Sequence, residues 1–363
     1  MSWDPTAEVD AYVRAKQIAL GQALAPRTKV YLDLNFWIGL RDVALGLRRD
    51  EPAVQLLTRL REGVANGQLI CPVAETFFLE LLKQPLSPDR RIGTARMVDE
   101  LSLGVAMLPS PRRVGTEIYQ LFHTMMKRPE PLFAMKELIW TKVCHILGPS
   151  YPVTDQLDAA TLLVVQKGVM DDLWELSLTQ IVHAIGDAAE AESYVDLTAE
   201  TNRLRDLHAD EITTFASAYD MELRGAIESV GSLAADILGD IGERAGFGAE
   251  RPTSGEGRRL MLNMARNLLH IAFVQNDAAS TVRTLHVEAA LHAALRADKQ
   301  RRFKINDWHD FRHAAAALSY CDLFFTEGPL QQLVVRPQMG LLRLNGCKVA
   351  STLPTALALL DVA

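Results

Sequence analysis

Apolar and polar residues follow two different patterns along this chain. Up to about residue 110, short apolar runs rich in Val, Ile and Leu are bounded by turn residues, which predicts buried strands at 29–33, 68–73 and 105–108. Helical spacing separates the runs, at 5–23, 36–47, 51–64, from about 74 to before Pro85, and 88–102. Alternating strands and helices indicate a parallel sheet that is covered on both faces.

The pattern changes from residue 114 onwards. Residues 114–297 contain almost no strand signal and are rich in Ala, Leu, Glu and Arg at a spacing of 3.6 residues, as in EIYQLFHTMM, so we predict an all-helical block. We expect the Gly-rich segment 246–257 to be a mobile loop. Strand character returns at 322–326 and 348–351. We therefore expect an α/β domain built from residues 1–113 and 298–363, interrupted by a helical insertion at 114–297.

Composition narrows the class of protein. The 363 residues are 48% apolar and 23% charged, which is ordinary for a soluble globular protein. No apolar run approaches the ~20 residues of a membrane span, and the N-terminus does not read as a signal peptide. Four scattered cysteines without a CxxC pair fit a reducing cytosol, so we expect a cytoplasmic protein without a membrane partner. With a net charge of −7, any polyanion partner requires a local basic patch or metal ions.

An acid stands where the first predicted strand ends, in VYLDLNFW (30–37). Asn35 is a candidate N-cap for the following helix. Asp33 then either assists that cap or is held at the carboxyl end of the strand, where open α/β sheets place their active sites.

More acids precede the strand DLFFT. Asn306 is a predicted N-cap of a helix that carries Asp307 and Asp310 three residues apart, on one face. Carboxylates that converge at strand ends repel one another unless a cation is present, and hard oxygen ligands select Mg²⁺ or Mn²⁺. Such ions activate water and stabilise the oxygens of an in-line phosphoryl displacement.

Together these motifs resemble those of the PIN-like nucleases: an aspartate ending the first strand (LDLN), a glutamate in the helix after the second strand, and an aspartate opening the helix before LFFT. The resemblance covers about 30–110 and 300–360. It implies a three-layer α/β/α fold around a central parallel sheet, here interrupted by the large all-helical insertion. It also implies hydrolysis of single-stranded RNA with Mg²⁺ or Mn²⁺, as by toxins of toxin–antitoxin modules or by RNA-processing enzymes.

The resemblance assigns the metal-binding and catalytic acids by position. Asp33 matches the first acid, and Asp310 the third, with Asp307 on the same face. The second acid is Glu75 or Glu80, which lie about 140° apart around a helix and cannot face the same point. Glu80 suits the family position, several residues after the strand.

The fourth acid of the family has no direct match. Gly328 stands where the family often has an aspartate, and only the adjacent Glu327 is acidic. Asp322 lies four strand residues before Thr326, at the other end of the sheet. The fourth ligand and a second metal ion therefore stay open.

Further polar residues near these acids are candidates for substrate binding. Thr326 or Asn35 would orient a ligand or the substrate. The basic run KQRRFK contributes Arg301, Arg302 and Lys304, which either form a solvated helix end or hold a phosphate backbone. A histidine pair with i, i+4 spacing, His309 and His313, lacks a third zinc ligand at a recognisable spacing and is interpreted as partly exposed.

The sequence thus predicts a metal-dependent endoribonuclease. The competing hypothesis is a catalytically inactive PIN-like scaffold that binds RNA or a protein through its helices, which Gly328 and the acidic net charge favour. The expected partners are single-stranded RNA and an antitoxin-like protein or complex component bound by the insertion, while a homo-oligomer stays open.

Overall fold

The computed structural model describes residues 8–187, 194–208, 210, 212, 214–246, 252–275 and 277–362. Its centre is a parallel sheet with the strand order β2-β1-β5-β6. The strands of this sheet are β1 (Thr28–Leu32), β2 (Leu69–Ile70), β5 (Leu323–Phe325) and β6 (Lys348–Ala350). From β1 the chain moves to β2 on one side, whereas β5 pairs with β1 on the other side and leads away to β6. The strand order therefore reverses between β1 and β5, the place where open α/β sheets bind ligands.

Helices cover both faces of the sheet, because side chains alternate along its strands. Tyr31 and Phe324 pack with α13 (Arg283–Ala297) and α14 (Asp307–Tyr320). Val30, Leu32 and Phe325 lie in the opposite core. The helices of that core are α2 (Leu34–Ala44), α3 (Glu51–Ala65), α4 (Glu75–Leu82), α5 (Arg91–Ser102) and α16 (Leu353–Leu360). The predicted α/β class with a parallel sheet is confirmed.

The second predicted strand is much shorter than expected. Pairing between β1 and β2 ends at Ile70 because Pro72 has no N–H to continue the ladder. The chain then turns toward β3 (Val105–Met107), where Val73 N donates to Val105 O at 3.3 Å and Met107 N donates to Val73 O at 2.8 Å. The predicted third strand exists, but apart from this bridge it pairs antiparallel with β4 (Trp140–Lys142).

β4 corrects the expectation that residues 114–297 are all-helical. The segment around it, IWTKV, is rich in β-branched and aromatic residues. The other helices in this part of the chain are α6 (Ser110–Met125), α7 (Met135–Leu138), α8 (Ala159–Trp174), α9 (Leu178–Ile185), α10 (Val195–Leu207), α11 (Phe215–Arg244) and α12 (Gly255–Gln275). Of the predicted mobile loop, residues 247–251 lie outside the described residues, and α12 begins within it.

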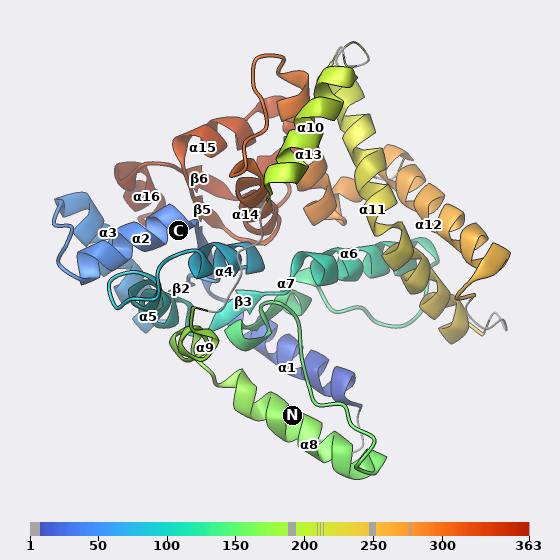
Figure 1. The fold of residues 1–363 in the computed structure, drawn as a ribbon, viewed down its shortest axis with the longest axis horizontal. Coiled ribbons are helices and arrows are strands. Elements are labelled where there is room, and N and C mark those ends of the chain that lie inside the picture. Colours follow the sequence, from blue (N-terminus) through green and yellow to red (C-terminus); the bar gives the residue numbers. More distant parts are fainter. Residues whose placement is uncertain are drawn as a thin grey trace.

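Packing crosses the expected boundaries of the insertion. α13 packs against α14 beside the sheet and also against α11, which in turn packs on α12 and α6. α1 (Val9–Leu24) packs on α7 and α8. Figure 1 shows α3 and α12 at opposite ends of the molecule, with the sheet between them. In the described part of the chain, no helix is both long enough and apolar enough to cross a membrane.

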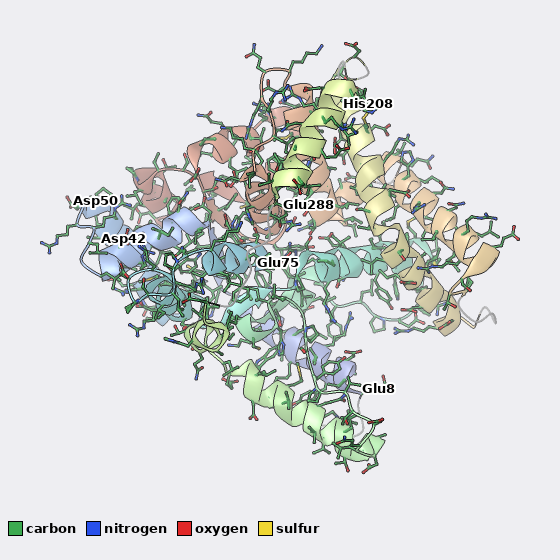
Figure 2. All side chains as sticks on the ribbon, in the orientation of Figure 1. Glu8, Asp42, Asp50, Glu75, His208 and Glu288 are labelled. Carbon is green, nitrogen blue, oxygen red and sulfur yellow. The ribbon has the colours of Figure 1, made fainter. Side chains whose placement is uncertain are left out.

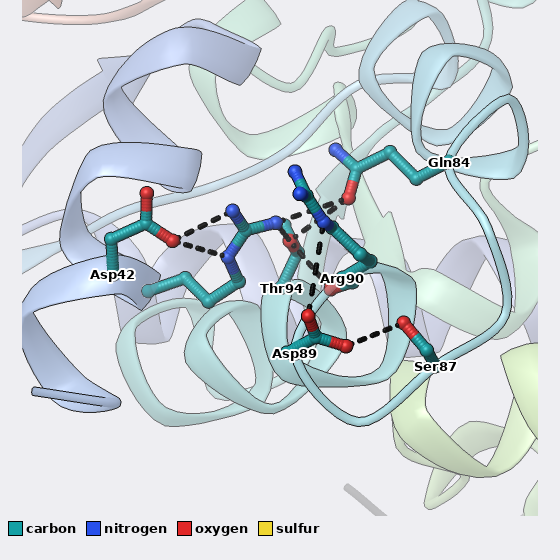
Figure 3. A network of polar contacts seen from close by, with 7 residues as sticks. Asp42, Gln84, Ser87, Asp89, Arg90 and Thr94 are labelled. Carbon is teal, nitrogen blue, oxygen red and sulfur yellow. Dashed lines mark hydrogen bonds and ion pairs between the residues drawn. The ribbon is translucent and has the colours of Figure 1, made fainter. Parts of the chain in front are cut away.

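A buried arginine fixes the direction of α2. Arg41 is 2% exposed and donates to Asp42 at 2.7 Å, to Thr94 at 3.2 Å and to Gln84 at 3.4 Å. Figure 3 shows Asp42, Gln84 and Thr94 converging from α2, the turn after α4, and α5. Because hydrogen bonds to charged groups are stronger than average, this network helps to hold α2, the helix that follows Asp33, in position.

Candidate functional site

Asp33 directly follows β1 and caps α2. Its carboxylate accepts from Asn35 N at 3.1 Å and from Phe36 N at 3.2 Å, so the helix begins at Leu34. The expected cap at Asn35 is therefore wrong: the side chain of Asn35 instead donates to Glu327. Asp33 is 7% exposed; burial raises its pKa, against the hydrogen bond from Thr326 and the positive charge of His313.

Glu80 reaches the same place from α4. Its Oε2 lies 2.7 Å from Nε2 of His313, whose Nδ1 lies 2.8 Å from the hydroxyl of Tyr31 on β1. Burial acts to lower the pKa of His313, but the bond to Glu80 and the charges of Glu80, Asp33 and Asp310 raise it above its usual value. The pKa of Glu80 is lowered, because its interaction with His313 outweighs burial. His313 is therefore the common neighbour of these acids, and their charges favour its protonated form.

Asp310 lies one helical turn before His313 on α14. Burial, together with the charges of Asp307, Glu327 and Glu80, raises its pKa to about 7, against the positive charge of His313. A carboxyl group that titrates near neutral pH can accept or give a proton under physiological conditions. The structure thus brings Asp33, Glu80 and Asp310 together around one histidine, at the carboxyl ends of β1 and β5.

Glu75, the alternative second acid, has a structural role. It is 8% exposed, accepts from Ser110 N at 2.7 Å and pairs with Arg113 at 3.4 Å. Figure 2 shows Glu75 between α4 and α6, the helix whose first backbone N–H it satisfies. Glu75 contacts α6 and Glu80 contacts His313, which confirms that the two side chains face different points.

Asp307 is also engaged locally. Its carboxylate pairs with Arg301 at 2.9 Å and accepts from Lys304 N at 2.8 Å, so it closes the turn that leads into α14. Asn306 stands at the N-cap position but makes no side-chain cap bond, contrary to expectation. The carboxylate of Asp307 is directed at this turn, and its charge acts on the acid cluster by raising the pKa of Asp310.

Both histidines are buried, at 2% exposure, so the expectation of partly exposed side chains is wrong. His309 Nε2 lies 2.7 Å from Lys83 Nζ, and because the ammonium group donates, His309 accepts as a neutral ring. Burial lowers the pKa of His309 to about 4, which agrees with this. Tyr194, from the segment before α10, stands edge-on to His309 with Lys83 over its ring.

A basic cleft of about 500 Å³ lies between residues 298–304 and residues 329–336. The predicted substrate-binding residues Arg301, Arg302 and Lys304 line it, and Arg336 joins them from the turn after α15 (Gly328–Val334). Asp298 is its single acid. Arg301 connects the cleft to the acid cluster through its pair with Asp307.

At the position of the family's fourth acid this chain has Gly328, and the neighbouring Glu327 is the nearest acid in the sequence. Gly328 forms the first turn of α15, with open space where a Cβ would stand. The carboxylate of the preceding Glu327 accepts from the amide of Asn35, two residues after Asp33, and its charge raises the pKa of both Asp33 and Asp310. Asp322 accepts from Lys29 N at 2.8 Å at the opposite end of the strands, as expected.

The fit of a divalent cation can be judged from these donors. Carboxylate oxygens suit Mg²⁺ or Mn²⁺ chemically. Among the described residues, however, no three His, Cys, Asp or Glu side chains are grouped closely enough to hold an ion. Glu80 is directed at His313 and Asp33 at the start of α2, so the spacing as observed does not form a metal centre.

Sequence reasoning considered His313 only as half of a possible zinc pair and missed its buried position between Glu80 and Tyr31. The signal for it was present, since residues three apart on a helix share a face, and Asp310 and His313 have that spacing. Its partners Tyr31 and Glu80 are more than 200 positions away in the sequence, at separations of 282 and 233 residues, and only folding brings them together.

Comparisons with known proteins leave the family of this chain open: no protein-family model, no curated protein and no solved structure matches it.

Proposed function

We propose that this protein is a metal-dependent nuclease that hydrolyses phosphodiester bonds of single-stranded RNA, with its active site at the carboxyl ends of β1 and β5. One observation carries the proposal: the buried His313 binds Glu80 at 2.7 Å and lies one helical turn after Asp310 on α14, beside the strand end that carries the buried Asp33. Burying several carboxylates together costs stability, so such a cluster is typical of a functional site.

The surroundings support a substrate with phosphate groups. The basic cleft provides guanidinium and ammonium groups for the RNA backbone, and its Arg301 pairs with Asp307, whose charge acts on Asp310. Asp310, with its pKa of about 7, would take the proton of the attacking water. Thr326 holds Asp33, and His313 holds Glu80. To hold Mg²⁺ or Mn²⁺, Glu80 would have to turn away from His313 and Asp33 from the start of α2, and the ion would then supply Lewis acidity.

The test is Mn²⁺-dependent cleavage of single-stranded RNA by the wild type and two variants. Asp33→Asn keeps a good N-cap and removes the charge, so we expect cleavage to fall by at least about 100-fold. Without metal its melting temperature should equal or exceed that of the wild type, because a buried charge that repels Glu327 is gone.

Asp322→Asn is the matched control. It makes the same change at the opposite end of the strands, directly before β5, and its amide oxygen can still accept from Lys29 N. Cleavage by this variant should match the wild type. Equal activity in all three proteins would place the active site elsewhere.

One observation favours the second candidate, a catalytically inactive scaffold that binds RNA or a protein. His313 already pairs with Glu80 at 2.7 Å, so this carboxylate has a partner without an ion. Thermal melting with Mn²⁺ separates the two candidates. A nuclease site should be stabilised by the ion in the wild type and not in Asp33→Asn, whereas a scaffold should show no such difference.

A further inference from the structure

A cavity of about 210 Å³ lies beside the acid cluster, between α2, α3 and the start of α16. Its position follows from the sheet, because Thr326 and Ser351 come directly after β5 and β6. The cavity thus occupies the same carboxyl-end crevice as the acids, toward the opposite face of the sheet.

The walls of the cavity are apolar. Phe36, Leu40, Leu56 and Leu353 line it, and Phe36 is only partly buried. The volume is below the roughly 300–1,000 Å³ of sites for drug-sized ligands, so it suits a single ring system. An apolar slot beside a partly exposed aromatic ring can hold an unstacked base.

Polar groups stand at one side of the cavity. The carboxylate of Glu327 accepts from the Asn35 amide, and both residues line the cavity. Thr326, which is hydrogen-bonded to Asp33, lines the cavity next to Glu327, so the cavity adjoins the acid cluster at these two residues. Arg48 lines the same cavity.

We propose that this cavity binds a nucleobase of the RNA strand, that of the nucleotide whose phosphate lies at the acid cluster. This inference rests on the proposed nuclease function for the identity of the strand. A carboxylate accepts hydrogen bonds and cannot donate them, so Glu327 favours bases that carry an exocyclic amino group. Adenine, cytosine and guanine have one, whereas the single N3–H donor of uracil is flanked by two carbonyl groups that a carboxylate repels.

Nucleoside binding without divalent ions tests the cavity apart from catalysis. The wild type and Asp33→Asn should bind adenosine, cytidine or guanosine at least 10-fold more tightly than uridine. In Gly39→Leu, which places a side chain within the lining, binding should weaken at least 10-fold. A Cβ at Gly39 would meet only the end of the flexible Arg48 side chain, at 3.1 Å, so the fold should persist.

Two further variants test whether the loss of binding is specific to the cavity and whether Glu327 sets the base preference. Gly168→Leu makes the same change on α8, where a Cβ meets nothing within 4 Å, and should leave binding unchanged. Glu327→Gln, at an exposed position, should reduce the preference against uridine, because an amide can also donate. Equal nucleoside affinity of Gly39→Leu and the wild type would overturn the proposal.

Oligonucleotides show whether the base belongs to a strand. A short RNA should bind Asp33→Asn more tightly than an abasic ribose-phosphate chain of equal length, and Gly39→Leu should lose that difference. Equal binding of both chains, or binding of mononucleotides alone, would contradict a base site for RNA.

If nucleosides and RNA behave as expected but the wild type does not cleave RNA, the nuclease proposal fails and the base site stands. If RNA is cleaved while Gly39→Leu keeps the wild-type KM and base preference, the base site fails alone.

Discussion

Among the single residues of this protein, Glu117 on α6 is a carboxyl group completely buried in the core. It accepts from Thr284 N at 3.1 Å and from the Thr284 hydroxyl at 2.8 Å, and Tyr320 also donates to it. Burial nevertheless dominates and raises its pKa from 4.5 to about 7. The folded state therefore keeps a proton between these values that the unfolded state has lost.

This shift predicts a pH dependence of stability. Because the folded pKa is raised, the free energy of unfolding should fall as pH rises from about 4.5 to about 7 and then level off, by about 3 kcal/mol for this group. Glu117→Gln should lack that loss, so its stability relative to the wild type should rise between pH 5 and pH 8. Urea unfolding at both pH values measures the difference. The exposed Glu100→Gln is the control, and an equal slope in all three proteins would contradict the prediction.

At the scale of elements, two helices approach each other closely through a glycine. A Cβ at Gly21 on α1 would lie 2.3 Å from the backbone oxygen of Glu137 on α7. Backbone atoms cannot move aside as the end of a side chain can. The absence of a side chain at this position is what allows α1 to pack on α7.

Two identical substitutions should therefore have opposite effects. Gly21→Ala should lower the free energy of unfolding by about 1–3 kcal/mol, because overpacking outweighs the better helix propensity of alanine. Gly168→Ala on α8, where a Cβ meets nothing, should raise it by up to about 1 kcal/mol. Chemical denaturation of both variants provides the measurement, and stabilisation by both would mean that α1 and α7 are not in close contact.

At the scale of the whole molecule, α13 belongs to two cores. Leu291 and Val287 pack in the core on one side of the sheet. Leu285 and Ala289 pack among α6, α11 and α12. A rigid helix shared in this way couples the sheet to the helical part of the chain.

We therefore predict that the sheet and the helical part unfold together. Leu291→Ala should lower the free energy of unfolding by about 2–5 kcal/mol and shift a single transition. Far-UV circular dichroism and tryptophan fluorescence, to which the buried Trp37 and Trp140 contribute, should give the same midpoint. Two transitions, with only one shifted by the substitution, would show that 114–297 folds as an independent domain.

The sequence by itself determined the order of the elements near the sheet and the position of its acids. Short Val- and Leu-rich runs bounded by turns predicted β1, β5 and β6 to within about two residues, because burial on both faces requires apolar residues over that length. The acid after the first strand and the acid on α14 could be identified in the same way.

Only the tertiary structure decided which partner each polar group has. Glu75 and Glu80 share a helix, yet one caps α6 and the other meets His313. Folding likewise decided that Asp307 pairs with Arg301. It also decided that β4 pairs with β3, a strand more than 30 residues earlier in the chain. A local pattern records which face of an element is buried. It does not record which distant element covers that face, and the charge and hydrogen bonding of a buried group depend on that neighbour.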